Sequence, residues 1–461
     1  MADDLAQLFQ PFPPATMADW RRLVIAEMGE EGLARLSTRL REEIEVKPLY
    51  GPEDALPEGP WPGCPPYTRG AAAAAWRVGQ LYDRGDVAAA HAALRRDVAG
   101  GARLLWLRLA AAGEPGIRLE TAAELAELVA GVDLSEVAVL IDAGGATPAA
   151  AALWLAHLER SGVAKQALYG GLACDPTAAL ARRGVLQGDL DDHWREIAGV
   201  ARWLGREAPG LRAVLISTLP YHRAGATAVE ELALALAGGT DALRRLTAAG
   251  LSVDDACRQL RFAFATGGDL FLEIAKLRAA RLLWAKVTRA CGAGAAAQYA
   301  PLYARTSPAT KARRSPWTNQ LRLSVETLGA VLGGAEAVVT GRWDELLRRD
   351  DGASARLALN TQHVLAYEAF FGRVADPAGG SWYVERLTDE LARAAWRRFQ
   401  AVERSGGIVA GLLDGSLAAR LAEQAAAKER AVALRRDPLI GVSAFAHPAE
   451  TPPPAAPAEA G

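Results

Sequence analysis

Cysteine is scarce in this 461-residue chain, and no two cysteines lie close together in the sequence. The four are Cys64, Cys174, Cys257 and Cys291, with no Cys-x-x-Cys pair among them. This spacing argues against a disulfide framework and against a zinc cluster, because both need cysteines at short intervals. A reducing cytoplasm is the simplest compartment for such a chain.

An excess of charge and long hydrophobic runs are also missing. The formal net charge is −2, so nothing in it favours binding to nucleic acid or to an anionic membrane. No run of about 18 apolar residues occurs, and the acidic start Met-Ala-Asp-Asp lacks the basic and apolar regions of a signal peptide. We therefore expect a cytoplasmic protein with no membrane span.

Three regions follow one another along the chain. In residues 1–66, apolar spacing predicts a helix from Thr16 to about Leu40, with Thr16 as its N-cap. The proline-rich remainder, up to Pro66, excludes regular structure, so we expect an arm that wraps another surface. Residues 437–461 end in proline, alanine and glutamate, which predicts a disordered tail.

The central region, residues 67–436, alternates short β-rich runs with longer helical patterns, as βα units require. The clearer strands are expected at residues 137–142, 167–171, 212–217, 260–264 and 337–340, and fainter ones near 103–109, 299–305 and 373–376. About eight such units favour a TIM barrel over an open sheet. Catalytic groups of such a barrel lie at the carboxyl ends of its strands. The ends in question are near Asp142, Gly170, Ser217, Thr266, Ser307 and Thr340.

These strand ends carry few catalytic groups. The richest is Ser217-Thr-Leu-Pro-Tyr-His222, in which His222 is a candidate general acid or base. No carboxylate adjoins it in the sequence, so the alternative is a loop histidine that bonds to nearby backbone. Gly144-Gly145 and Gly379-Gly380 could bring backbone amides to a phosphate, although such pairs are more often simple turns.

The run from Leu272 to Lys286 has charged residues at helical spacing between apolar ones, which predicts an amphipathic helix. We expect its apolar residues to pack in the core beside Phe264, together with Phe271 just before the run. Two later segments, Asn360-Thr-Gln362 and Asp376-Pro-Ala-Gly-Gly-Ser-Trp-Tyr-Val-Glu385, are considered together with this run.

Together with these segments, the run resembles the barrel of the adenosylcobalamin-dependent methylmalonyl-CoA mutases. The resemblance extends, with gaps, from about Val46 to Arg436. It implies a TIM barrel of the acyl-CoA mutase type, preceded here by an extended N-terminal helical arm.

The resemblance also implies that catalytic residues are missing. The family's Pro-Pro-Phe-x-Arg-Gly motif survives as Pro65-Pro-Tyr-Thr-Arg-Gly70, but residues 71–75 are alanines where the family has a cofactor-facing Tyr. Pro220 takes the aligned place of the catalytic His, and His222 is displaced by two residues, which would change its aim.

Residues that meet substrate in the family are altered as well. The coenzyme-contacting Arg-Leu-Ser triplet becomes Gln259-Leu-Arg261, and the segment along the coenzyme A tail has no counterpart in Trp76–Asp83. Arg183 aligns with the arginine that clamps the substrate carboxylate, in unlike surroundings. A surface guanidinium is the alternative interpretation of Arg183.

The stretch Asp191-Asp-His193 begins like the Asp-x-His-x-x-Gly motif whose histidine binds cobalt. Its sixth residue is Glu196 instead of Gly, and the stretch opens a helix for which Asp191 or Asp192 would be the N-cap. We therefore expect no metal ligand here, no cofactor bound by this chain and no C-terminal cobalamin-binding domain.

The resemblance thus implies the small, non-catalytic subunit of a heterodimeric mutase whose partner carries adenosylcobalamin and converts (R)-methylmalonyl-CoA to succinyl-CoA. The arm would embrace that partner. Its candidate anchors are Phe9, Phe12, Trp20 and Trp61. Two alternatives stay open, namely a competent acyl-CoA mutase barrel that borrows cobalamin from another chain and a regulatory binding protein of the mutase.

Overall fold

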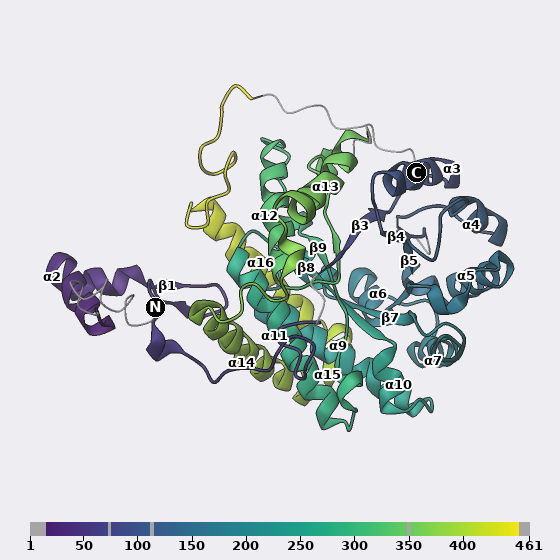
Figure 1. The fold of residues 1–461 in the computed structure, drawn as a ribbon, viewed down its shortest axis with the longest axis horizontal. Coiled ribbons are helices and arrows are strands. Elements are labelled where there is room, and N and C mark those ends of the chain that lie inside the picture. Colours follow the sequence, from purple (N-terminus) through teal and green to yellow (C-terminus); the bar gives the residue numbers. More distant parts are fainter. Residues whose placement is uncertain (1–14, 72–74, 111–114, 348–351, 451–461) are drawn as a thin grey trace, which may run out of the picture.

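The computed structural model describes residues 15–71, 75–110, 115–347 and 352–450, and its centre is a closed barrel of parallel strands (Figure 1). Within these residues the strands follow one another around the barrel in chain order, and the last pairs with the first. Their bounds are β3 Arg77–Tyr82, β4 Leu104–Arg108, β5 Ala138–Asp142, β6 Gly170–Cys174, β7 Leu211–Ser217, β8 Leu260–Thr266, β9 Leu302–Thr306 and β10 Ala337–Val339. The predicted TIM barrel is confirmed.

Helices surround this barrel, as βα units require (Figure 1). Ahead of it stand α2 Met17–Leu36 and the short hairpin of β1 Thr38–Arg39 and β2 Glu45–Val46. The helices of the barrel and its carboxyl-terminal extension are α3 Val87–Ala99, α4 Ala122–Leu128, α5 Thr147–Ser161, α6 Pro176–Arg183, α7 Leu190–Glu207, α8 Leu219–Arg223, α9 Ala228–Ala248, α10 Val253–Arg258, α11 Leu270–Ala290, α12 Thr318–Leu332, α13 Ala353–His363, α14 Trp382–Arg404, α15 Gly407–Leu413 and α16 Ser416–Ala433. None of the described helices has the length and hydropathy to cross a membrane.

One predicted strand is wrong and one was missed. Phe371–Arg373 forms a 3-10 turn, and no strand follows it before α14. The strand that was not predicted is β3, the first of the barrel, whose Gly79 and Gln80 interrupt the apolar pattern. Both residues have a structural reason, because a Cβ at Gly79 would lie 2.9 Å from the Val338 carbonyl oxygen and buried Gln80 donates to the Ala355 carbonyl at 3.2 Å.

The interior of the barrel is filled by side chains of the strands. In β4, Leu104 and Trp106 point inward, whereas Leu105 and Leu107 pack against the helices, as the two-residue repeat of a strand requires. The inward cluster of buried residues comprises Leu104, Trp106, Ala138, Leu140, Ala173, Leu215, Ala263, Tyr303, Ala337 and Val339. This part of the barrel is therefore a packed core instead of a channel.

The charged residues of α11 correct the amphipathic interpretation. Lys276, Arg278 and Arg281 are all buried. Arg278 forms ion pairs with Asp376 and, at 2.6 Å, with Glu385, so the Asp376–Glu385 segment is fixed by a charge inside the protein. Phe271, in contrast, is exposed at the start of the helix, which also corrects its predicted place in the core.

The N-terminal arm begins as predicted, with Thr16 as N-cap of α2 and a reciprocal bond to Asp19. The helix ends at Leu36, four residues early, and projects from the body with Gly32 as its one buried described residue (Figure 1). The proline-rich segment then runs over this chain's own helices, where Arg386 donates to the Asp54 carbonyl at 2.6 Å and Arg69 pairs with Asp376 at 2.8 Å.

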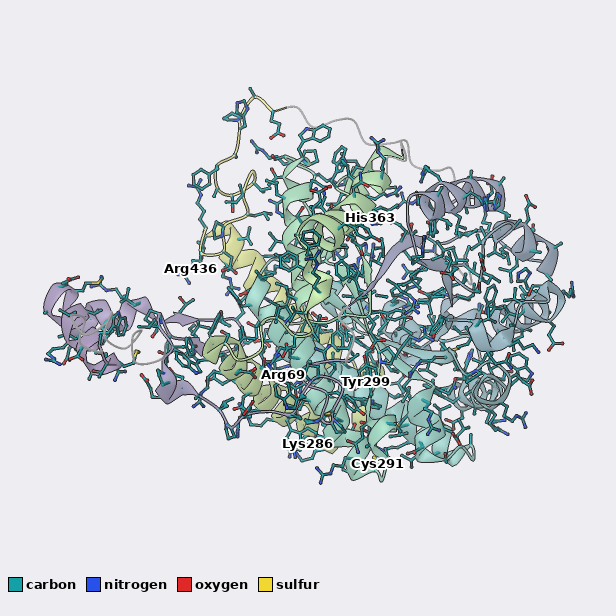
Figure 2. All side chains as sticks on the ribbon, in the orientation of Figure 1. Arg69, Lys286, Cys291, Tyr299, His363 and Arg436 are labelled. Carbon is teal, nitrogen blue, oxygen red and sulfur yellow. The ribbon has the colours of Figure 1, made fainter. Side chains whose placement is uncertain are left out.

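Several predictions fall outside these ranges. Phe9, Phe12, the alanines at 72–74 and the tail beyond 450 lie outside the described residues. Residues 437–450 form turns against α12, where Arg322 donates to the Ile440 carbonyl, near the labelled Arg436 in Figure 2.

Candidate functional site

His222 lies at the carboxyl end of the barrel, in α8 directly after β7, and both of its ring nitrogens are bonded. Nδ1 lies 2.7 Å from Glu231 Oε1, and Nε2 lies 2.6 Å from Ser307 Oγ. Although no carboxylate adjoins His222 in the sequence, the fold brings one to it. Glu231 stands nine residues later in the first turn of α9, where the N-cap Thr227 starts the helix and turns the chain back toward the barrel.

Ser307, His222 and Glu231 form a series of hydrogen bonds that we call the relay. Its donors can be assigned from the other contacts of these residues. The Ala309 amide donates to Ser307 Oγ at 3.0 Å, so the serine proton is free to point at His222 Nε2. The proton on Nδ1 then faces Glu231. Burial alone would raise the pKa of Glu231, but Lys276 and His222 lower it to about 2, so the carboxylate is charged.

The order serine, histidine, carboxylate is that of a hydrolase triad. Ser307, however, is completely buried, and its hydroxyl already accepts from the following turn. A nucleophile must reach its substrate. The relay therefore ties the loop after β7 to the loop after β9 and does not present an attacking group.

Lys276 of α11 closes the other side of Glu231. Its ammonium group lies 3.3 Å from Glu231 and 2.6 Å from Glu273, and it donates to the Ala265 carbonyl at 2.7 Å. Burial would lower the pKa of Lys276, but the two carboxylates raise it. The three N–H donors of Lys276 thus find partners within one buried cluster of three charged groups. None of them is free to bind a substrate.

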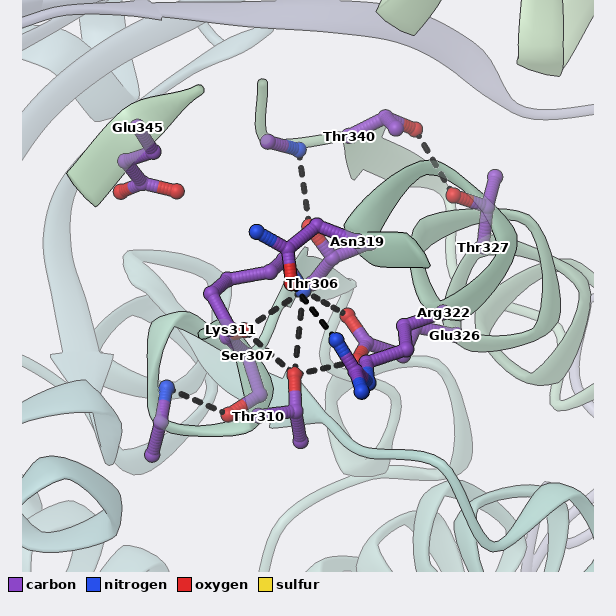
Figure 3. Close-up of polar contacts among 12 residues, drawn as sticks. Thr306, Ser307, Thr310, Lys311, Asn319, Arg322, Glu326, Thr327, Thr340 and Glu345 are labelled. Carbon is purple, nitrogen blue, oxygen red and sulfur yellow. Dashed lines mark hydrogen bonds and ion pairs between the residues drawn. The ribbon is translucent and has the colours of Figure 1, made fainter. Parts of the chain in front are cut away.

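A second buried ion pair fills the ends of β9 and β10 (Figure 3). Lys311 lies 2.6 Å from Glu326 and donates to the Ser307 carbonyl at 2.8 Å, and both charged side chains are fully buried. Burial lowers the pKa of Lys311 and raises that of Glu326, and each partner opposes the shift of the other. The Gly341 amide donates to Thr306 Oγ1 at 2.7 Å beside them.

The ends of β5 and β6 carry two buried aspartates. Asp142 accepts from Trp106 Nε1 at 3.2 Å and pairs with Arg108 at 3.1 Å; burial alone would raise its pKa, but Arg108 and its hydrogen bonds lower it. Asp175 accepts from the Ser217 and Ala178 amides at 2.9 and 2.8 Å. Burial is the main reason that its pKa is raised to about 6.

The remaining predicted residues lie apart from this cluster. Arg183 is exposed at the last residue of α6, as its surface interpretation requires. Pro220 lies in the first turn of α8. Gly144 starts a 3-10 turn, and the Gly380 amide donates to Glu385 at 3.0 Å, so both glycine pairs serve as turns.

His193 is buried on the outer helix α7, and its Nε2 lies 2.5 Å from the Gln187 carbonyl oxygen. The N-cap of that helix is Asp189 instead of Asp191 or Asp192. Nε2 of His193 is therefore occupied by a carbonyl of the chain itself and is not available to a metal. Within the described ranges no group of His, Cys, Asp and Glu side chains could hold a metal ion.

Sequence reasoning did not foresee what Arg261 does. It is buried inside the barrel and donates to Tyr303 Oη at 3.0 Å, to the Arg212 carbonyl at 3.2 Å and to the Gly170 carbonyl. Trp76 Nε1, just before β3, donates to Gln362 at 3.1 Å. Arg261, in the triplet that replaces a coenzyme contact, and Trp76, where the family's coenzyme A segment has no counterpart, are thus both bonded to other residues of this chain. The only signal in the sequence was an arginine within an otherwise apolar strand.

Comparison with known proteins gives similarity over nearly the whole chain. A family model described as methylmalonyl-CoA mutase matches residues 39–460. The methylmalonyl-CoA mutase small subunit of Streptomyces virginiae is 42% identical, over 96% of this chain and 73% of the relative. The small subunit of Propionibacterium freudenreichii subsp. shermanii is 34% identical, over 98% and 72%. The methylmalonyl-CoA mutase of Rhizobium meliloti is 32% identical, over 93% and 64%.

Proposed function

Because the chain belongs to the methylmalonyl-CoA mutase family, we propose that it is the small, non-catalytic subunit of an adenosylcobalamin-dependent mutase. In this proposal a homologous catalytic subunit binds the cofactor in the cytoplasm and interconverts (R)-methylmalonyl-CoA and succinyl-CoA. The present chain supports that subunit in a heterodimer and has no turnover alone.

The observation that carries the proposal is the filled barrel. Trp106, Tyr303 and Arg261 occupy its interior, and His222 at its carboxyl end is bonded on both nitrogens. An acyl-CoA and a cofactor need open space lined by groups with free bonding capacity. A barrel in which His222, Lys276 and Lys311 are bonded to other residues of the chain supports a structural role better than a catalytic one.

Cofactor chemistry points the same way. Adenosylcobalamin supplies the radical by cleavage of its cobalt–carbon bond, so turnover needs a chain that holds it. The described residues do not fit this cofactor, because His193 lies on the outer helix α7 with Nε2 at a backbone carbonyl, and His222 at the barrel mouth is bonded on both ring nitrogens. We therefore assign the cofactor to the partner.

The projecting arm supports association with another chain. α2 leaves the exposed side chains of Leu23, Ile25 and Met28 in solvent, and a 20-residue helix with so little burial gains stability from a surface that covers it. A homologous mutase subunit is the partner that the names of the relatives suggest.

The decisive experiment compares the purified chain with its mixture with the catalytic subunit. Alone, the chain should form no succinyl-CoA, and titration with adenosylcobalamin should leave the cobalamin absorption unchanged. With the catalytic subunit it should co-elute in size exclusion, and the complex should turn over. Turnover by the chain with added cofactor would instead support a competent barrel that borrows cobalamin, and binding that changes only the regulation of an active partner would support a regulatory protein.

A further inference from the structure

The outer faces of α12 and α13 carry large apolar side chains in solvent. On α12 these are Trp317, Leu321 and Val325, spaced by four residues, so they share one face of the helix. Beyond it are Leu357 on α13, Val364 and Tyr367 in the π-helix that continues α13, and Phe370 and Val374 in the loop after it, all exposed. We call these eight residues the flank surface.

The two halves of the flank surface lie on neighbouring helices. α12 and α13 lie side by side at the top of the molecule, and Gln320 donates to Thr361 across them at 2.9 Å (Figure 1). The His363 ring, labelled in Figure 2, stacks on Tyr367 with ring centres 5.8 Å apart. Tyr367 is therefore held against α13.

The composition of this face differs from an ordinary solvated helix surface. Over residues 313–325 and 356–374 the exposed charged side chains are the arginines at 313, 314, 356 and 373 and a single acid, Glu368. Aromatic and arginine side chains without lysine are the composition of protein–protein interfaces. Apolar patches of this kind are seldom left uncovered on a monomer.

We propose that the flank surface is the docking site for the catalytic mutase subunit, through an apolar patch edged by carboxylates on that subunit. This inference rests on the function proposed above. The arginines decide between possible occupants. A second copy of this chain that used the same face in a two-fold dimer would bring arginines against arginines, which costs free energy. A different chain with acidic residues at the rim avoids that repulsion and gains attraction.

The test measures binding of the full chain to the catalytic subunit by calorimetry. Leu321→Glu and Tyr367→Glu alter two side chains that are 69% and 72% exposed, so the fold should be kept. Leu413→Glu, at a position 70% exposed on α15, is the matched control. We expect the two flank variants to weaken binding at least tenfold, Leu413→Glu to change it less than twofold, and higher salt to weaken binding of the unaltered chain.

Each other outcome overturns the assignment in its own way. If the unaltered chain binds the catalytic subunit and the flank variants bind equally well, the docking site lies elsewhere and the proposed function stands. If the control weakens binding as much as the flank variants, the effect is not specific to this face. If the unaltered chain does not bind at all, the proposed function fails as well. If the chain alone dimerises and Leu321→Glu makes it monomeric, the occupant is a second copy.

Discussion

His222 is the residue on which a catalytic interpretation of this barrel depends, and its removal separates the two roles. His222→Ala breaks one neutral hydrogen bond, to Ser307, and one to the charged Glu231. Such bonds contribute roughly 1 and 2 kcal/mol. Ser307 keeps its bond from the Ala309 amide, and Glu231 keeps Thr218 and Lys276, so no orphaned charge is left. We expect the free energy of unfolding to fall by about 2 to 3 kcal/mol.

Turnover should respond differently. A histidine that ties two loops contributes nothing to the chemical step, so the reconstituted complex with His222→Ala should keep its rate constant within about a factor of two. A positioned proton donor would lower it by about 10²-fold or more. Denaturant unfolding of the chain and initial rates of the complex measure the two quantities. His193→Ala is the control, because that buried histidine has one bond to a carbonyl, worth about 1 kcal/mol.

The reasoning is refuted by one combination of results. If His222→Ala abolishes turnover while the complex assembles at full strength, the imidazole acts on substrate, and the catalytic role belongs to this chain. A stability loss below that of His193→Ala would refute the structural part, because the relay would then not be holding the loops.

Three further perturbations test other parts of the structure. Asp175 keeps its proton in the folded state up to about pH 6 against 3.8 unfolded, so lowering the pH from 8 to 4 should stabilise the unaltered chain relative to Asp175→Asn by about 2.4 kcal/mol, measured by urea unfolding at each pH. Arg278→Met should lower the free energy of unfolding by about 2 to 3 kcal/mol because it removes charged hydrogen bonds to Asp376 and Glu385, of which Asp376 keeps Arg69 and Glu385 keeps the Gly380 amide, whereas Lys286→Ala on the exposed side of the same helix should cost under 1 kcal/mol. Deleting residues 1–45 should leave a folded barrel by circular dichroism and weaken co-elution with the catalytic subunit; full-strength co-elution would show that the arm is not an interface.

The strands could be predicted because local composition determines them. Ala-Val-Leu-Ile-Asp at β5 and Leu-Arg-Phe-Ala-Phe in β8 are apolar runs that suit strands buried on both faces. β3 could not be predicted in this way, because residues far along the chain determine Gly79 and Gln80. The Val338 carbonyl leaves no room for a Cβ at position 79, and Gln80 donates to the Ala355 carbonyl. Local pattern predicts an element; it does not predict an exception that the neighbouring strand or helix imposes.

The site was harder to predict for the same physical reason. His222, Glu231 and Ser307 come from the ends of β7 and β9 and the start of α9, and a span of 85 residues separates His222 from Ser307. A βα barrel brings all strand ends to one face, so a histidine at one end should be tested against carboxylates in the first turn of the next helix. That rule would have found Glu231, whereas Ser307 required the register of the closed barrel.

Arg261 and Lys276 show how such a barrel stays folded without open catalytic groups. A charged side chain inside a protein is tolerated when it is paired or hydrogen-bonded. Arg261 is bonded to Tyr303 and to backbone carbonyls, and Lys276 to two carboxylates and a carbonyl. These hydrogen bonds and ion pairs keep both side chains from binding a substrate, and they also stabilise the strand ends. The polar interior therefore contributes to the fold, while the exposed apolar side chains of the arm and of the flank surface are the groups that a partner could cover.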